Sequence, residues 1–441
     1  MFHPKDVRGR MSRRTLLERA GGLAVAGGLL AACGNTTDVK SDGGPVTQAG
    51  SVVTAATDTA EAVPLGPGGI PIASRDRPVQ LPLYDNNPPI DSGLPVENGP
   101  LKVYNWADYI DPETVKKFEK QYNTKVEITT FQNEDEAMAK LQTGSVDFDV
   151  YFPSVTRLPI LVSKQLVRPI NKDYITNLAS NVWPELVDPF YDKGAQYAVP
   201  YVVFATGLVW RNDKITEDIG AMANPWASFW EYGEKYKGKV AILDDPRDSL
   251  SLALFRENGT AGVDVNSEDP QVVAKALQGL KELDALASVK VTINGYQTVP
   301  EGKIWLAHDW TGDQIAAALY YMPKGVKPDV LSYWKPAIAA PGANDLMAVL
   351  STGKNPVLAH AFLDFMLDET NAYNNFADYN GYQPPQNNLD FATLQTKLGL
   401  PDSVAPAIMQ RDDFKTGLTY QTLTPDGKAL WDKAWADFRA G

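Results

Sequence analysis

The sequence predicts a two-lobed α/β protein, and three observations lead to this prediction. The chain has 441 residues, which is more than one typical core needs and enough for two lobes. Hydrophobic residues make up 44% of it, which allows cores of that size. Strand and helix patterns alternate with short connections between residues 101 and 153, and this order predicts a parallel sheet with right-handed crossovers.

The first predicted strand covers residues 102–105, and a helix follows it. Asp111 is a suitable N-cap for this helix, with Pro112 at its first position. Three apolar or aromatic residues recur along it at helical spacing, namely Val115, Phe118 and Tyr122. A second strand is indicated by alternation of Val126, Ile128 and Thr130.

Asn133 is placed to cap a second helix, with Glu136 in the position that completes a capping box. A third strand is predicted at residues 148–152, ended by Pro153. Helical patterns follow two later predicted strands, which cover residues 239–243 and 304–307. One more helix is predicted from the spacing of Leu358, Ala361, Phe362 and Phe365.

The N-terminus has the order of an export signal rather than of a folded domain. A twin-arginine pattern at residues 12–17 precedes a small, apolar stretch at residues 20–32, which is shorter than a membrane-spanning helix needs. Residues 30–33 resemble the bacterial lipobox, and Cys33 is the only cysteine of the chain. We therefore expect residues 1–32 to be a signal peptide and Cys33 to be lipidated, with the protein anchored to the outer face of the cytoplasmic membrane.

Residues 33–98 are predicted to be a tether between this anchor and the folded body. They are rich in glycine, proline, serine and threonine and have no sustained helical or strand period. An alternative is that part of the segment wraps the body, with apolar side chains as contacts. The candidates for such contacts are Ile70, Ile72, Leu81 and Leu83.

Charge and residue usage exclude several classes of function. The net charge is −13, and the first 32 residues carry six basic and two acidic side chains, so the remainder carries −17. This balance disfavours nucleic acid and anionic lipid surfaces as partners and tolerates a cationic solute. One cysteine and three scattered histidines provide no zinc-binding spacing, so we expect no metal and no cofactor.

Aromatic and acidic residues gather after the predicted strands. In an open α/β sheet, ligands bind beyond the carboxyl ends of the strands. Carboxylates accept charge-assisted hydrogen bonds from an organic ammonium group, and aromatic faces cover its methylenes. Any one of these residues taken singly is more simply a core residue or a helix cap, and Asp245 and Asp248 in particular could cap the helix after them. The residues at these strand ends are Trp106, Asp108, Tyr109, Ser154, Asp245, Asp248, Trp310 and Asp313.

From about residue 99 to 441, the chain resembles the spermidine/putrescine-binding proteins of bacterial ABC importers. The resemblance rests on an ordered set of blocks, which are residues 105–110, 148–154, 200–201, 226–230, 236–240, 243–245, 310–313, 345 and 381–384. It implies a periplasmic-binding-protein fold of the Venus flytrap type, type II, with a hinge that the chain crosses more than once. We expect one lobe from residues 99–205 and 343–392 and the other from residues 206–342 and 393–441.

The resemblance also implies a function without catalysis. The protein would capture a polyamine, putrescine or spermidine, in a cleft between the lobes and deliver it to a membrane permease, acting as a monomer. Residue by residue, it adds Asp345 as a ligand for an ammonium group and Tyr382 at the rim. Two positions depart from the spermidine binders, Thr156 and Ala343, and the Trp-x-Gly-Asp of residues 310–313 is more similar to the putrescine-binding branch.

Two alternatives remain beside this prediction. One is a protein of the same fold that binds an amino-acid-like solute, ferric iron or a sugar. Another is an exported penicillin-interactive enzyme, suggested by the Ser-x-x-Lys spacing of Ser351 and Lys354, although Ser351 closes an apolar run instead of opening a helix. A phosphate-loop pattern at residues 233–239 is dismissed, because Val240 replaces the Ser or Thr that binds Mg²⁺ and because the pattern precedes a strand instead of following one.

Overall fold

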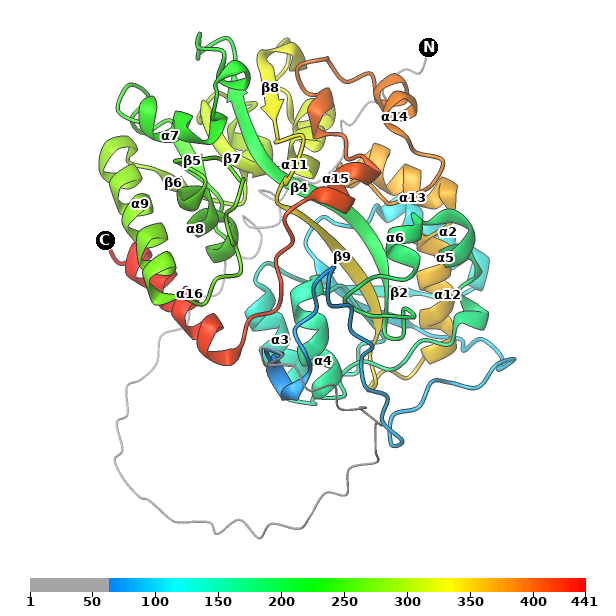
Figure 1. Ribbon diagram of the computed structural model, residues 1–441. Coiled ribbons are helices and arrows are strands. Elements are labelled where there is room, and N and C mark those ends of the chain that lie inside the picture. Colours follow the sequence, from blue (N-terminus) through cyan, green and yellow to red (C-terminus); the bar gives the residue numbers. More distant parts are fainter. Residues whose placement is uncertain (1–62) are drawn as a thin grey trace, which may run out of the picture. The chain divides into compact units, whose positions relative to one another are not determined.

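The predicted β-α-β-α-β stretch is confirmed in the computed structural model, which describes residues 63–441 (Figure 1). Its elements are β1 (Leu101–Trp106), α2 (Pro112–Tyr122), β2 (Val126–Phe131), α3 (Glu134–Gln142) and β3 (Val150–Tyr151). Asp111 caps α2 by accepting a hydrogen bond from the backbone NH of Glu113, and Asn133 caps α3 through the NH of Glu136. Strand β1 runs parallel to β2 and β3, so their carboxyl ends share one edge of the sheet.

A long strand, β4 (Ala198–Arg211), joins the two halves of the molecule. Its first part, up to Ala205, pairs antiparallel with β9 (Gly342–Val349). Its second part, from Thr206 onward, pairs with β7 (Leu306–Trp310) and β8 (Leu331–Trp334). The sequence analysis did not find β4, because nearly every residue in it is buried and the alternation that marks a half-exposed strand is missing.

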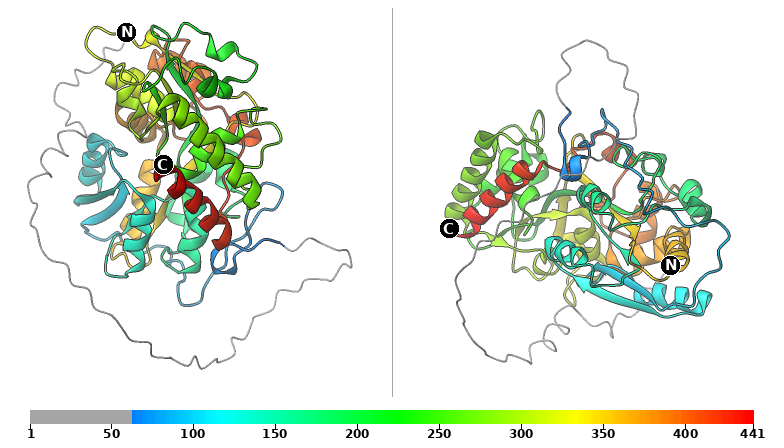
Figure 2. Two further views of the ribbon diagram at one scale, coloured as in Figure 1. Left: turned by 90° about the vertical axis from the view of Figure 1, so that its left-hand side faces the viewer. Right: turned by 90° about the horizontal axis from the view of Figure 1, so that it is seen from below.

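The nine strands form one sheet in the order β2-β1-β3-β9-β4-β7-β5-β6, with β8 beside β4. The two remaining strands are β5 (Val240–Ile242) and β6 (Lys290–Val291). We call the half that contains β1, β2, β3 and β9 lobe 1, and the half that contains β5, β6, β7 and β8 lobe 2. Figures 1 and 2 show β4 running from one lobe into the other. The residue boundaries predicted for the lobes stay a prediction.

Helices cover the sheet in both lobes. The other helices before residue 300 are α4 (Leu158–Ser163), α5 (Thr176–Asn181), α6 (Pro184–Val187), α7 (Ser228–Glu231), α8 (Pro246–Leu254), α9 (Pro270–Ala287) and α10 (Gly295–Thr298). Those that follow are α11 (Thr311–Ala316), α12 (Pro356–Met366), α13 (Glu369–Asn375), α14 (Phe391–Leu398), α15 (Arg411–Thr416) and α16 (Pro425–Arg439). Within residues 63–441, none of the helices has the length and apolar character needed to cross a bilayer.

Each lobe has its own hydrophobic core. In lobe 1, residues of β1, α2 and α12 pack together, among them Val103, Phe118 and Phe362. In lobe 2, α8, α9 and α16 pack against one another, with Trp431 of α16 fully buried. Burial of apolar surface contributes about 25 cal/mol per Å² to the stability of a domain. Each lobe is therefore stabilised by its own core.

The described part of the predicted tether, residues 63–98, follows lobe 1 closely. The prediction that apolar side chains hold it to the body is confirmed for Ile70, Ile72 and Leu81, which are 4%, 6% and 2% exposed. It is wrong for Leu83, which is 59% exposed because the chain turns away at residues 84–87. We call residues 64–98 the strap. Cys33, the predicted signal peptide and the remainder of the predicted tether lie outside the described residues.

Two predicted strands differ from their observed limits by two residues or more at one or both ends. Strand β3 is shorter than residues 148–152, and β7 begins at Leu306 and continues to Trp310. The extension of β7 follows from its partner, since β4 offers hydrogen bonds as far as Thr206, opposite Trp310. This pairing brings the last residues of β7 to the point where β4 passes between the lobes.

Candidate functional site

Three buried carboxylates at the junction of the lobes each accept a hydrogen bond from an aromatic side chain. The pairs are Tyr109–Asp345 (2.7 Å), Tyr382–Asp313 (2.8 Å) and Trp310–Asp248 (3.0 Å). The three acidic residues are only 6–8% exposed. All six residues belong to the predicted site, so the structure brings together the larger part of it.

Strand ends and helix starts position these side chains. Tyr109 lies in the loop after β1, and Asp345 lies in β9, opposite the first part of β4. Trp310 ends β7, and Asp313 lies in the first turn of α11 directly after it. Asp248 lies in the first turn of α8, after β5. Parallel strands that end at one edge, together with the central β4, therefore direct these groups toward one another.

Four aromatic rings connect the three pairs, those of Tyr109, Tyr382, Phe204 and Trp310. We call these rings, together with the three carboxylates bonded to them, the row. The ring centroids of Tyr109 and Tyr382 are 5.4 Å apart, those of Tyr382 and Phe204 are 5.8 Å apart, and those of Phe204 and Trp310 are 6.3 Å apart. Neighbouring rings meet edge to face, at interplanar angles of 71–82°. Phe204 is two residues before the point at which β4 changes partner, so the row crosses from lobe 1 toward lobe 2.

Hydrogen bonds to the backbone fix the position of Tyr109. Its carbonyl oxygen accepts hydrogen bonds from the Tyr201 hydroxyl and from Nδ2 of Asn380 (3.0 Å). Nδ2 of Asn375 in turn donates to the Tyr201 hydroxyl (2.7 Å), so two helical segments of lobe 1 hold the loop. Sequence reasoning missed Tyr201, Phe204 and these amides because nothing local separates them from ordinary core residues.

Burial changes the protonation of the carboxyl groups. It raises the pKa of Asp345 to about 7, although the hydrogen bond from Tyr109 acts in the opposite direction. The pKa of Asp248 also rises to about 7, first because of burial and then because of the neighbouring Asp245. An ammonium group placed beside such a carboxylate would favour its charged form and lower the pKa again.

Asp248 has a crowded environment at the lobe 2 end of the row. Its Oδ1 accepts hydrogen bonds from the hydroxyls of Thr206 (2.7 Å) and Tyr420 (3.1 Å), in addition to the indole NH at Oδ2. Neither Thr206 nor Tyr420 was predicted. Asp245 is the N-cap of α8 and accepts hydrogen bonds from the backbone NH groups of Arg247 and Asp248. The alternative that it caps this helix is thus the arrangement found.

Ser154 lies beside the site in lobe 1, and an acidic residue that the sequence analysis missed holds it. Its hydroxyl donates to Oε2 of Glu134 and its backbone NH donates to Oε1, both at 2.8 Å. Arg157 pairs with the same carboxylate at 3.2 Å. An isolated β-bridge places Ser154 next to Asp345, so the serine lies close to the row, with its hydroxyl turned to Glu134.

The two other predicted residues lie after β1 with contacts of their own. The ring centroids of Trp106 and Phe131 are 4.5 Å apart. The indole NH of Trp106 is buried and has no hydrogen-bond partner among the described residues. Asp108 has a positive φ of 55° and accepts a hydrogen bond from the Tyr379 hydroxyl at 3.4 Å. That their side chains contact a ligand stays a prediction.

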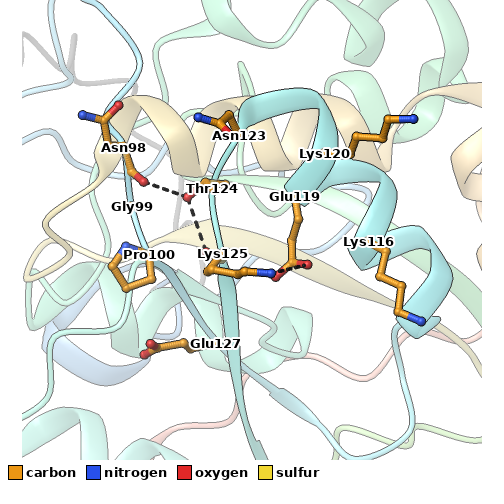
Figure 3. A pocket seen from close by; sticks show the side chains of 10 residues that line it. All are labelled: Asn98, Gly99, Pro100, Lys116, Glu119, Lys120, Asn123, Thr124, Lys125 and Glu127. Atoms are coloured by element: carbon orange, nitrogen blue, oxygen red, sulfur yellow. Dashed lines mark hydrogen bonds and ion pairs between the residues drawn. The ribbon is translucent and has the colours of Figure 1, made fainter.

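A surface pocket lies at the other edge of the lobe 1 sheet, where β1 and β2 begin (Figure 3). Its lining comes from residues 98–100, from residues 116, 119 and 120 of α2, and from residues 123–125 and 127. Lys116, Lys120 and Lys125 lie on it together with Glu119 and Glu127, and no aromatic side chain does. The pocket is therefore separate from the aromatic and acidic row at the carboxyl ends of the strands.

Comparisons with known proteins show the family to which the chain is similar. The model of the family described as bacterial extracellular solute-binding proteins matches residues 113–393. A putrescine/cadaverine-binding protein of Pseudomonas aeruginosa is 32% identical over 277 residues, which are 62% of this chain and 75% of that protein. A spermidine/putrescine-binding periplasmic protein of Escherichia coli is 27% identical over 272 residues, 62% of this chain and 73% of that protein.

Solved structures share the fold. A spermidine/putrescine ABC transporter substrate-binding protein of Streptococcus pneumoniae matches with a TM-score of 0.61 and 24% identity over 77% of this chain and 98% of that chain. A lipoprotein of Treponema pallidum matches with a TM-score of 0.61 and 22% identity, over 77% of this chain and 99% of that chain. These matches bear out the α/β periplasmic-binding-protein fold that the sequence predicts.

Proposed function

Since this chain belongs to the family of bacterial extracellular solute-binding proteins, we propose that the solute it binds is a polyamine, putrescine or spermidine. Proteins of this family bind solutes for transport and are not enzymes. The observation that carries the proposal is the row of three buried carboxylates, each bonded to an aromatic donor, at the junction of the lobes.

The chemistry of the row suits an alkyl chain with ammonium ends. A buried carboxylate is costly without a positive partner, and an ammonium group supplies one together with two or three hydrogen bonds. The aromatic rings between the carboxylates would cover the methylenes and attract the cation. Two similar proteins named for binding putrescine support the same class of solute. The proposed ligand residues are the six members of the three bonded pairs, Tyr109, Asp248, Trp310, Asp313, Asp345 and Tyr382. Trp106, Asp108, Ser154 and Asp245 are proposed around them.

The proposal extends to location and partner. We place the protein outside the cytoplasmic membrane, held by a lipid on Cys33, and we assign it to the delivery of its solute to the permease of an ABC importer. The order of charge, apolar stretch and lipobox at residues 12–33 supports the anchor. Membership of the family of bacterial extracellular solute-binding proteins supports the partner.

The test is the thermal stability of the purified protein with putrescine, spermidine, a neutral amino acid and glucose. A ligand at 100 times its dissociation constant adds about 2.7 kcal/mol to the free energy of unfolding. We expect putrescine, spermidine or both to stabilise the protein, and the neutral amino acid and glucose to have no effect. Stabilisation by the amino acid or glucose, with none by either polyamine, would contradict the proposal and leave the fold unaffected.

Affinity for a polyamine is expected to fall in acid. Asp345 and Asp248, with pKa values raised to about 7, are largely ionised at pH 8 and protonated at pH 5.5, and a protonated carboxyl group cannot neutralise an ammonium group. Each protonation weakens binding by up to about 30-fold over this range, because the ionised fraction of a group with a pKa of about 7 falls by that factor from pH 8 to pH 5.5. Isothermal titration with putrescine at several pH values measures the effect, with thermal unfolding at each pH as the control for the fold. An affinity that stays constant from pH 8 to 5.5 is inconsistent with these carboxylates meeting the ligand.

A further inference from the structure

Asp248 is held by donors from three separate segments of the chain. Its Oδ1 accepts hydrogen bonds from the hydroxyls of Thr206 (2.7 Å) and Tyr420 (3.1 Å), and its Oδ2 accepts one from the indole NH of Trp310 (3.0 Å). Thr206 and Trp310 are directly opposite each other in the paired strands β4 and β7, so the sheet itself places them. Tyr420 lies outside the sheet, in the connection between α15 and α16, and its position therefore needs another cause.

One asparagine fixes the backbone on both sides of Tyr420. Asn266 lies in the loop between α8 and α9 of lobe 2. Its Nδ2 donates to the carbonyl oxygen of Thr419 (2.9 Å), and its Oδ1 accepts a hydrogen bond from the backbone NH of Gln421 (2.8 Å). The two neighbours of Tyr420 are thus bonded to the same amide, which places the tyrosine between them against lobe 2.

The guanidinium group of Arg247, in the first turn of α8, holds the ring of Tyr420. It lies 5.2 Å from the centroid of this ring and 4.8 Å from a ring centroid of Trp431 in α16. Its Nη2 donates to the carbonyl oxygen of Val265 (2.8 Å) and to Oδ1 of Asn266 (2.7 Å). Because a cation over an aromatic face is attracted to it, Arg247 and Asn266 together form a support for Tyr420.

The ring and the backbone of Tyr420 make these supporting contacts, whereas its hydroxyl donates to Asp248. The support therefore has a consequence at the site, since it directs a phenol at a buried carboxylate that already has two other donors. A buried carboxylate held by several hydrogen bonds keeps one orientation, because rotation would break at least one of them.

We infer that Tyr420 is a positioning residue, whose hydroxyl holds the carboxylate of Asp248 in the orientation in which it meets an ammonium group. The inference rests on the proposed function, since it concerns the carboxylate at the lobe 2 end of the row. Tyr420 acts through Asp248 and has no need to contact the solute itself. Hydrogen bonds to a carboxylate also favour its charged form, which is the form that binds an ammonium group.

The burial of Asp248 and its hydrogen bonds act on its pKa in opposite directions. Burial, and then the charge of Asp245, raise this pKa to about 7, whereas the hydrogen bonds from Thr206, Trp310 and Tyr420 lower it. Removing the hydroxyl of Tyr420 therefore raises the pKa of Asp248 further. At a pH near 7, a smaller fraction of the protein then carries the negative charge that an ammonium group needs.

The other charged and titratable groups near Asp248 stay in place when only this hydroxyl is removed. Arg247 brings a positive charge from the same helix, and Arg157 of lobe 1 acts on Asp245. Burial raises the pKa of Tyr333 well above its usual value, so this neighbour in β8 is a neutral phenol. A change in how binding depends on pH can therefore be assigned to the lost hydroxyl.

The substitution Tyr420→Phe removes the hydroxyl and keeps the ring beside Arg247. We expect it to bind putrescine or spermidine, whichever the unchanged protein binds more tightly, about tenfold or more weakly at pH 7. Tyr236→Phe is the matched control, because it removes a hydroxyl that donates to another carboxylate, that of Glu217 (2.6 Å), in a part of lobe 2 outside the row. It should bind within about twofold of the unchanged protein. Isothermal titration measures both affinities, and thermal unfolding checks that the fold is kept.

The dependence on pH separates positioning from a purely structural role. Because Tyr420→Phe raises the pKa of Asp248, its loss of affinity is expected to be at least about twofold greater at pH 6.5 than at pH 8.5, where Asp248 is largely ionised in both proteins. A ring that only filled space would cause no loss, since phenylalanine fills the same space. Tyr236→Phe should show no such dependence.

The possible results distinguish the inference from the proposed function. If the unchanged protein binds neither putrescine nor spermidine, the proposed function is wrong and the inference is wrong with it. If it binds one of them and Tyr420→Phe binds the same solute within about twofold at both pH values, only the inference is overturned. An equal loss at both pH values also overturns the inference, because the hydroxyl would then not act through the ionised carboxylate.

Discussion

Replacing Asp345 by asparagine is expected to weaken the binding of a polyamine by about 100-fold or more. Asp345 is 8% exposed, and its described side-chain contact is the hydroxyl of Tyr109, so an ammonium group would be its positive partner. Removing one member of a buried ion pair costs about 3–5 kcal/mol, and each 1.4 kcal/mol is a factor of ten in affinity. Isothermal titration with putrescine and spermidine at pH 8 measures the change.

The same substitution is not expected to harm the fold. The amide can still accept the hydrogen bond from Tyr109, and the raised pKa of Asp345 means that its ionisation opposes folding above about pH 4. Asp345→Asn should therefore be at least as stable as the unchanged protein at pH 8. Asp412→Asn, at a side chain that is 88% exposed, serves as the control and is expected to leave the affinity unchanged. Binding by Asp345→Asn within threefold of the unchanged protein would mean that no cation meets this carboxylate.

Removing the strap is the second change with a large expected effect. A chain that begins at Leu101 lacks four side chains that are at most 6% exposed in the structure, Ile70, Ile72, Val79 and Leu81. Burying such a side chain contributes about 1.5–3 kcal/mol, so we expect a loss of at least about 5 kcal/mol relative to a chain that begins at Pro64. Chemical denaturation of the two chains measures the difference.

Polar contacts of the strap also stabilise the fold, so their loss adds to the effect of the truncation. The carboxylate of Glu97 accepts hydrogen bonds from the backbone NH groups of Val357 (3.2 Å) and Leu358 (2.8 Å), which begin α12. The Arg75 guanidinium donates to the carbonyl oxygens of Phe414, in α15, and of Gly417, directly after this helix. A chain without the strap would leave these groups without their partners, at a helix start and at a connection toward lobe 2.

Two leucines of the strap form a matched pair for the same prediction. Leu81 is 2% exposed and Leu83 is 59% exposed, although they are two residues apart. Leu81→Ala should cost about 2–4 kcal/mol, and Leu83→Ala should stay within about 0.5 kcal/mol of the unchanged protein. Equal stability of the two variants, or of the two truncated chains, would mean that the strap does not pack on lobe 1 in solution.

The sequence was sufficient to predict features that depend only on residues close together in the chain. Helix caps depend on residues two or three apart, so Asp111 and Asn133 could be identified without a fold. The strand β2 was found from its alternation, whereas β4 was missed because both its faces are buried. The strap shows the same limit, since Leu81 and Leu83 have equal hydrophobicity and only the path of the chain separates them.

The sequence by itself determined the kinds of element and the kinds of side chain at the strand ends, aromatic and acidic. Only the tertiary structure decided which aromatic group bonds to which carboxylate. In the sequence, Asp345 is 236 positions from its donor Tyr109, Asp313 is 69 positions from Tyr382, and Asp248 is 62 positions from Trp310. Such pairs form because β4 meets β9 on one side of its midpoint and β7 on the other, and the register of those strands is set by the packing of whole lobes.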